Sequence, residues 1–112
     1  MLLMTRDEAL FRTPELAEEL RRVCDRFHVR KLDVFGSAAT GDGFDPTRSD
    51  LDVLAEFEPL SPAEYADAWF GLREALERIM DRPVDLLTEA ALENPHLRRR
   101  VEAERQTVFP TT

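Results

Sequence analysis

The sequence is poor in several residue types, and each shortage narrows the range of possible proteins. Its only cysteine is Cys24, so no disulfide can form within the chain. Its two histidines, His28 and His96, are too few for a Cys/His zinc cluster. No apolar run is long enough to span a membrane or to direct export, so we expect a cytoplasmic protein without a membrane segment.

Basic residues are also scarce relative to acidic ones. Fifteen Lys and Arg against twenty-three Asp and Glu give a net charge of −8. This balance disfavours bulk binding to nucleic acid, because such binding needs basic side chains to displace counterions from the backbone. It does not exclude a small anionic ligand, which a single metal-lined site can hold whatever the global charge.

The overall composition and the length indicate one folded domain. The chain is 43% hydrophobic and 34% charged, values ordinary for a folded protein and too apolar for intrinsic disorder. A length of 112 residues suits a single core, and no repeat or linker interrupts it. We therefore predict one domain over residues 1–112.

Local patterns predict an alternation of helices and strands. Helices should begin where a capping residue precedes proline, at Thr13-Pro14, Ser61-Pro62 and Asn94-Pro95. Strands are indicated by alternating or short apolar runs at residues 29–35, 51–57, 84–87 and 107–109. Residues 38–49 should form a turn or short helix followed by a loop. The order predicts an α/β (α+β) fold in which helices cover a small mixed sheet of three to four strands.

A pair of acidic residues stands at the start of the second predicted strand. Asp50 and Asp52 are two residues apart, so their side chains point the same way, about 7 Å apart at the backbone. Carboxylates this close repel each other unless a divalent cation neutralises them. Mg²⁺ held by carboxylates and substrate phosphates is the usual arrangement in nucleotidyl transfer. Alone, the pattern is weak and is better explained by a loop cap beside a solvent-facing aspartate.

Two further features are consistent with a phosphate and metal site. Gly36-Ser37 directly follows the first predicted strand, where glycine allows close backbone approach and the serine hydroxyl can cradle phosphate oxygens. An ordinary turn is the alternative. Asp85 lies within an apolar run that we expect to be buried, so it needs a partner. That partner is either a metal shared with the other carboxylates or a base such as Arg30 or Arg82.

The other polar residues give no comparable indication of a catalytic or binding site. On the first strand, alternation places Lys31 and Asp33 on the polar face. The histidines have no acidic or serine partner at motif spacing, which argues against a catalytic role. Residues Arg98–Arg100 are followed by Glu102 and Glu104, which favours a solvated helix face over a nucleotide-binding or partner-binding patch.

Taken together, these residues resemble the nucleotidyltransferase superfamily of the DNA polymerase β type. The likeness is to its minimal members, which act as antitoxins paired with HEPN-domain toxins, and it extends from Leu16 onward. It is carried by Phe35-Gly36-Ser37, Gly41, Ser49-Asp50-Leu51-Asp52-Val53-Leu54, Val84-Asp85-Leu86-Leu87, Asn94-Pro95-His96-Leu97 and Val108-Phe109.

The resemblance implies an enzyme that moves AMP, or another NMP, from an NTP to an acceptor hydroxyl. It implies that Asp50 and Asp52 bind catalytic Mg²⁺ and that Asp85 completes the metal site and acts as general base. Gly36 and Ser37 would hold the triphosphate. The acceptor implied is a tyrosine of a cognate HEPN toxin.

The chain departs from the family pattern at one position. An arginine is common in the turn after Gly-Ser, whereas this chain has Thr40, which cannot supply a positive charge. A second hypothesis is therefore a catalytically weak antitoxin that blocks its partner by occlusion. A third is transfer to a small molecule such as an aminoglycoside, which usually needs a second domain. The nucleotide, the number of residues added and the oligomeric state stay open.

Overall fold

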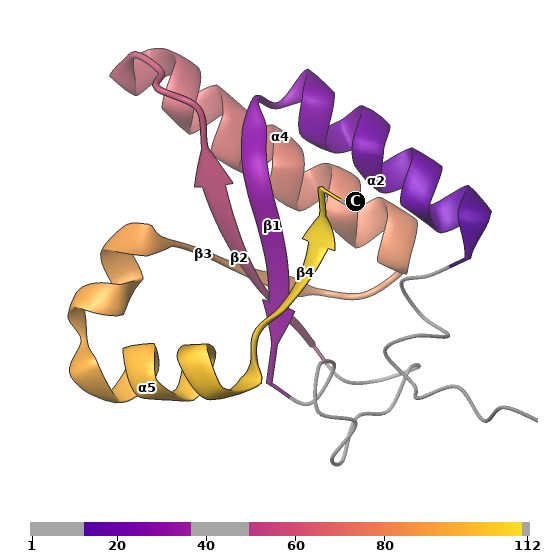
Figure 1. Ribbon diagram of the computed structural model, residues 1–112. Coiled ribbons are helices and arrows are strands. Elements are labelled where there is room, and N and C mark those ends of the chain that lie inside the picture. Colours follow the sequence, from indigo (N-terminus) through magenta and orange to yellow (C-terminus); the bar gives the residue numbers. More distant parts are fainter. Residues whose placement is uncertain (1–12, 37–49, 111–112) are drawn as a thin grey trace, which may run out of the picture.

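The computed structural model describes residues 13–36 and 50–110, shown in colour in Figure 1. Ser37 and the predicted turn over residues 38–49 lie outside the described residues. The elements follow in the predicted order, with one addition, the 3₁₀ helix η1. They are α2 (Pro14–Arg26), β1 (Val29–Phe35), β2 (Leu51–Phe57), α4 (Pro62–Met80), β3 (Val84–Thr88), η1 (Glu89–Glu93), α5 (Pro95–Glu104) and β4 (Gln106–Phe109).

Polar caps fix where the helices begin. The Thr13 hydroxyl accepts a hydrogen bond from the amide of Leu16, at the start of α2. Ser61 and Glu64 form a reciprocal capping box at the start of α4, and the Asn94 side chain accepts from two amides of α5. Each cap satisfies backbone N–H groups that have no partner within the helix. These local bonds explain why the predicted helix starts are confirmed.

The strands form one mixed sheet, as predicted. The order is β3-β2-β1-β4, in which β1 runs antiparallel to both neighbours while β2 and β3 are parallel (Figure 1). This order makes β1 and β2 the central strands and leaves β3 and β4 at the edges. Among the described residues, no helix has the length and apolar character that crossing a membrane requires.

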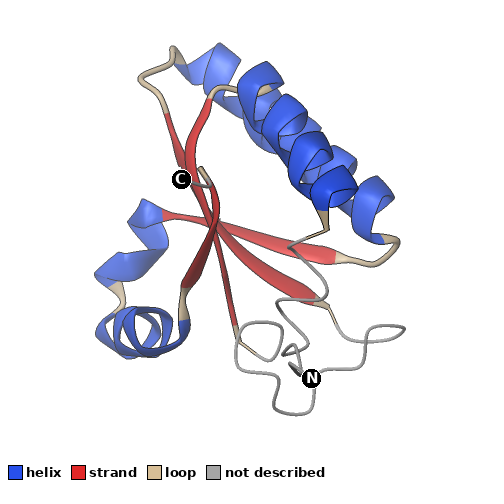
Figure 2. Ribbon diagram, turned by 45° about the vertical axis from the view of Figure 1, so that its right-hand side comes forward, coloured by secondary structure: helices blue, strands red, loops and turns tan. Residues whose placement is uncertain are grey.

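Helices cover both faces of the sheet (Figure 2). On one face α2 and α4 pack on a core that includes Leu51, Val53 and Ala55 of β2. On the other face Leu54 of β2 packs with Val101 of α5. Alternation along β2 therefore directs Asp52, like Leu54, toward the α5 side of the sheet.

The prediction for Asp33 was wrong. Its side chain is only 1% exposed, and it accepts a hydrogen bond of 2.8 Å from Nε of Arg105. The polar face expected for β1 is covered because β4 flanks the strand and α5 packs over it. Arg105 follows α5 directly and carries the charge that Asp33 needs when it is removed from water.

Candidate active site

The predicted functional residues that the structure describes lie at one end of the sheet. In the antiparallel pair Phe35 lies opposite Asp52, and in the parallel pair Asp52 lies opposite Asp85. Gly36 follows Phe35 directly, and Asp50 is an exposed residue just before β2. Because neighbouring strands are about 4.8 Å apart, the topology places a glycine turn and three carboxylates in one small region.

Gly36 touches the carboxylate of the adjacent strand. It has a φ of +73°, a left-handed conformation that side chains disfavour. A Cβ atom at this position would lie 2.4 Å from Oδ2 of Asp52 and 2.9 Å from Nη2 of Arg100. Both the conformation and the close approach therefore require glycine here. The N–H of Gly36 donates to Oε1 of Glu104 over 2.9 Å.

Arg100 is a site residue that the sequence prediction missed. Its Nη2 lies 3.6 Å from Oδ2 of Asp52, its Nε lies 3.3 Å from Oε1 of Glu104, and its guanidinium lies over the ring of Phe35. Arg100 is exposed, as are Arg98 and Arg99, so the predicted solvated face is confirmed, but the prediction did not foresee the contact of Arg100 with Asp52.

Helical spacing could have predicted that Arg100 faces the sheet. Leu97, Arg100, Val101 and Glu104 follow at steps of three, one and three, which places them on one face of a helix. Val101 is fully buried and Leu97 packs against the same cluster, so this face meets the sheet. Charged residues that flank a buried stripe are directed toward the sheet surface rather than away from it.

Burial of Asp52 disfavours its ionised form. Burial raises the pKa of Asp52 above its ordinary value of 3.8, the charge of Arg100 opposes this rise, and the charges of Asp85, Asp50 and Glu104 add to it. Carboxylates so close to one another need a cation to offset their repulsion. Within the described residues Arg100 supplies it.

Asp85 is exposed, so the expectation that it would be buried was wrong. The reason is the sheet order: β3 is an edge strand, and only the alternate residues Val84 and Leu86 of that strand face the core. Arg30, one of the bases considered as its partner, instead forms an ion pair of 3.2 Å with Glu56. Asp85 thus presents its carboxylate to solvent beside Asp52.

Comparison with known proteins shows the family to which the chain belongs. The family model for the nucleotidyltransferase domain matches residues 16–108. The chain belongs to the nucleotidyltransferase family. This nucleotidyltransferase is 30% identical over 94 residues to a candidate protein adenylyltransferase of Methanocaldococcus jannaschii, covering 80% of this chain and 91% of the relative.

Solved structures of the same fold include a candidate minimal nucleotidyltransferase, 33% identical, with a TM-score of 0.59 over 80% of this chain and 86% of that one. Another is a complex of a tri-AMPylated HEPN toxin from Shewanella oneidensis with its MNT antitoxin. There the identity is 18% and the TM-score 0.52, over 85% of this chain and 70% of the other. At that identity the likeness shows a shared fold.

The donor set of this nucleotidyltransferase suits Mg²⁺. Asp50, Asp52 and Asp85 offer hard oxygen ligands at one sheet end, and Mg²⁺ takes one or two carboxylates together with phosphate and water oxygens. Over residues 13–36 and 50–110, no three acidic, histidine or cysteine side chains meet closely enough to enclose an ion by themselves. The described residues thus offer oxygen ligands of the kind that Mg²⁺ takes, but they form no closed metal cage.

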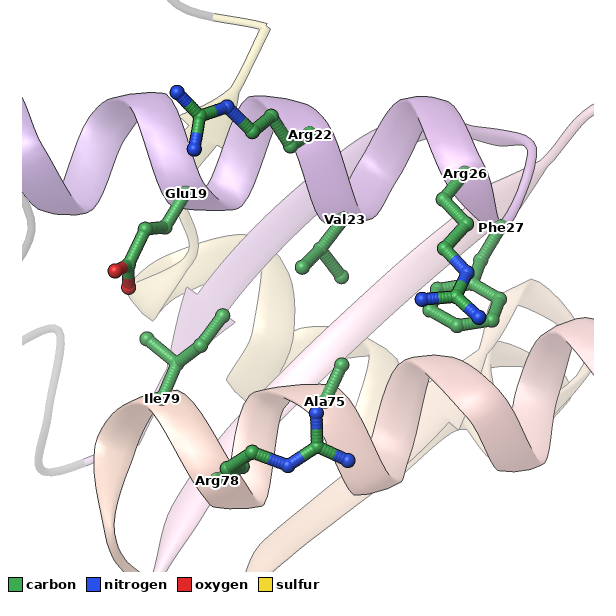
Figure 3. A pocket seen from close by; sticks show the side chains of 8 residues that line it. All are labelled: Glu19, Arg22, Val23, Arg26, Phe27, Ala75, Arg78 and Ile79. Atoms are coloured by element: carbon green, nitrogen blue, oxygen red, sulfur yellow. The ribbon is translucent and has the colours of Figure 1, made fainter.

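The cavity shown in Figure 3 lies elsewhere. It measures about 230 Å³ and lies between α2 and α4, with Val23 and Ile79 in its lining and the guanidinium of Arg26 over the ring of Phe27. These helices cover the face of the sheet opposite α5. None of Asp50, Asp52 and Asp85 lines this cavity.

Proposed function

We propose that the protein is a Mg²⁺-dependent adenylyltransferase that moves AMP from ATP to a tyrosine hydroxyl of a HEPN-domain toxin, and that it acts in the cytoplasm. The observation that carries the proposal is the alignment of Gly36, Asp52 and Asp85 across neighbouring strands. The names of its relatives support the acceptor class, since one is a candidate protein adenylyltransferase and another forms a complex with an AMPylated toxin.

The resemblance to the family suggests a role for each residue. Asp50 and Asp52 would hold the metal, which when bound neutralises phosphate charge and aligns the attacking and leaving oxygens. Gly36 and Ser37 would hold the triphosphate through backbone N–H groups and a hydroxyl. The close approach of Gly36 to Asp52 brings the phosphate-binding turn within contact of the metal-binding strand.

Asp85 is the general base in this proposal. Its exposed carboxylate lies beside Asp52 on the edge strand, where a protein acceptor has access. It would accept the proton of the acceptor hydroxyl as the oxygen attacks the α-phosphorus. A new oxygen–phosphorus bond forms, the bond between the α- and β-phosphates breaks, and pyrophosphate leaves. An edge strand suits an acceptor that brings its own binding surface.

A binding module that neutralises its partner by occlusion is the second candidate. Two observations favour it: Thr40 replaces the usual arginine, and Arg100 already pairs with Asp52. In this case the two proteins would associate without any transfer of nucleotide. The fold and the contact with the partner would be retained, and the carboxylates would have no catalytic task.

Transfer of label separates the two candidates. The protein is incubated with Mg²⁺, ATP labelled at the α-phosphate and the HEPN-domain protein encoded beside its gene. We expect label on the partner, lost when Asp50 and Asp52 are both changed to Ala, and retained in Asp67→Ala, an exposed acid on α4. Association of the two proteins without label would support occlusion and refute the enzyme.

A further inference from the structure

Helix α5 reaches into the site through two charged side chains. Arg100 contacts Asp52, and Glu104 accepts a hydrogen bond from the N–H of Gly36. The two side chains also bond to each other over 3.3 Å, four residues apart on the helix. The cationic Arg100 thus contacts Asp52, a proposed metal ligand. The anionic Glu104 contacts the N–H of Gly36, in the proposed phosphate-binding turn.

The positive charge of Arg100 supplies what the turn after β1 lacks. The segment from Gly36 to Gly41 reads Gly-Ser-Ala-Ala-Thr-Gly and contains no basic residue. Arg100 comes from a distant part of the chain, yet its Nη2 lies 2.9 Å from the position that a Cβ on Gly36 would occupy. A guanidinium in this position can donate two parallel hydrogen bonds to a phosphate.

Arg100 is also held in a way that suits a ligand contact. Its side chain is 50% exposed, so an incoming phosphate has access to it. The ring of Phe35, itself buried, lies beneath the guanidinium with 5.5 Å between the guanidinium carbon and the ring centroid. A side chain supported in this manner loses less conformational freedom on binding than a free surface arginine.

We propose that Arg100 is the triphosphate-binding cation of this site, resting on Asp52 and Glu104 in the absence of nucleotide and turning to the phosphates when ATP binds. The inference rests on the proposed function. It predicts opposite effects on two affinities, because Arg100 competes with a metal ion for Asp52 but helps to bind the nucleotide. Removing its charge should strengthen binding of the metal alone and weaken binding of the nucleotide.

Calorimetric titration of the full chain measures both affinities. We would compare wild type with Arg100→Ala, Arg100→Lys and the control Arg99→Ala, whose arginine is exposed one residue away on the same helix. The ligands are Mg²⁺ alone, and a non-hydrolysable ATP analogue with Mg²⁺. For Arg100→Ala we expect Mg²⁺ alone to bind about twofold to fivefold more tightly, as for release from an exposed ion pair. The analogue should bind at least about tenfold more weakly.

Further outcomes separate this inference from the proposed function. Arg100→Lys should restore part of the analogue affinity, and Arg99→Ala should match wild type. Analogue binding unchanged in Arg100→Ala, or Mg²⁺ and analogue both weakened together, would overturn the role of Arg100 while leaving transfer of AMP intact. If wild type binds no ATP analogue at all, the proposed function fails and this inference fails with it.

Discussion

Replacing Gly36 with alanine perturbs the contact on which the whole site depends. The added methyl group would lie 2.4 Å from Oδ2 of Asp52 and 2.9 Å from Nη2 of Arg100, and the φ of +73° adds strain for any side chain. A left-handed conformation costs a non-glycine residue about 1–2 kcal/mol. The carboxylate and the guanidinium must also separate, which moves a proposed metal ligand by a sizeable fraction of an ångström.

We therefore expect Gly36→Ala to lower the free energy of unfolding by about 1–2 kcal/mol and transfer of AMP by about a hundredfold. Urea unfolding measures the first effect and labelled ATP the second. Gly71→Ala is the matched control, because its Cβ would meet Phe27 at 2.3 Å in the packing between α2 and α4, away from the carboxylates. It should lose stability while the folded fraction stays active. Full activity in Gly36→Ala would refute the proposed site geometry.

Three other changes have expected outcomes. Asp85→Asn should lower the transfer rate by about 10²–10⁴-fold, as for loss of a general base, without weakening ATP binding in calorimetry; an unchanged rate would remove its role. Asp33→Ala leaves Arg105 without its buried partner and should cost about 3 kcal/mol in urea unfolding, whereas a loss below about 1 kcal/mol would contradict the burial argument. In the metal-free protein, carbon-13 NMR should show Asp52 titrating above 3.8, and higher still in Arg100→Ala. Because folding raises this pKa, the stability that Asp52 contributes is greatest below 3.8 and is lost as pH rises through the raised value, which pH-dependent unfolding checks.

Elements with local signals were predictable from the sequence. Thr13, Ser61 and Asn94 each satisfy backbone amides within three residues, so the information for each helix start lies beside it. Alternation along β2 likewise separates Leu51, Val53 and Ala55, which lie in the core on one face, from Leu54, which packs on the other. The glycine turn and the paired aspartates were singled out because they occur together, in the order that the nucleotidyltransferase family shows, although each alone has an ordinary structural explanation.

The errors arose where strand order decides burial. Asp33 is buried because β4 lies beside β1, and Asp85 is exposed because β3 is at the edge. Neither fact can be derived from alternation within one strand. Arg100 was missed because its partner, Asp52, lies 48 residues earlier in the chain, and an arginine run among glutamates is typical of a solvated face.

Intact-mass spectrometry of the partner protein tests the proposed chemistry most directly. The proposed HEPN-domain partner is incubated with ATP, Mg²⁺ and either wild type or Asp52→Asn. We predict that wild type adds whole AMP units to the partner, that a Tyr→Phe change at the modified position abolishes the addition, and that Asp52→Asn adds none. A stable complex of the two wild-type proteins in which the partner's mass is unchanged would contradict the adenylyltransferase proposal.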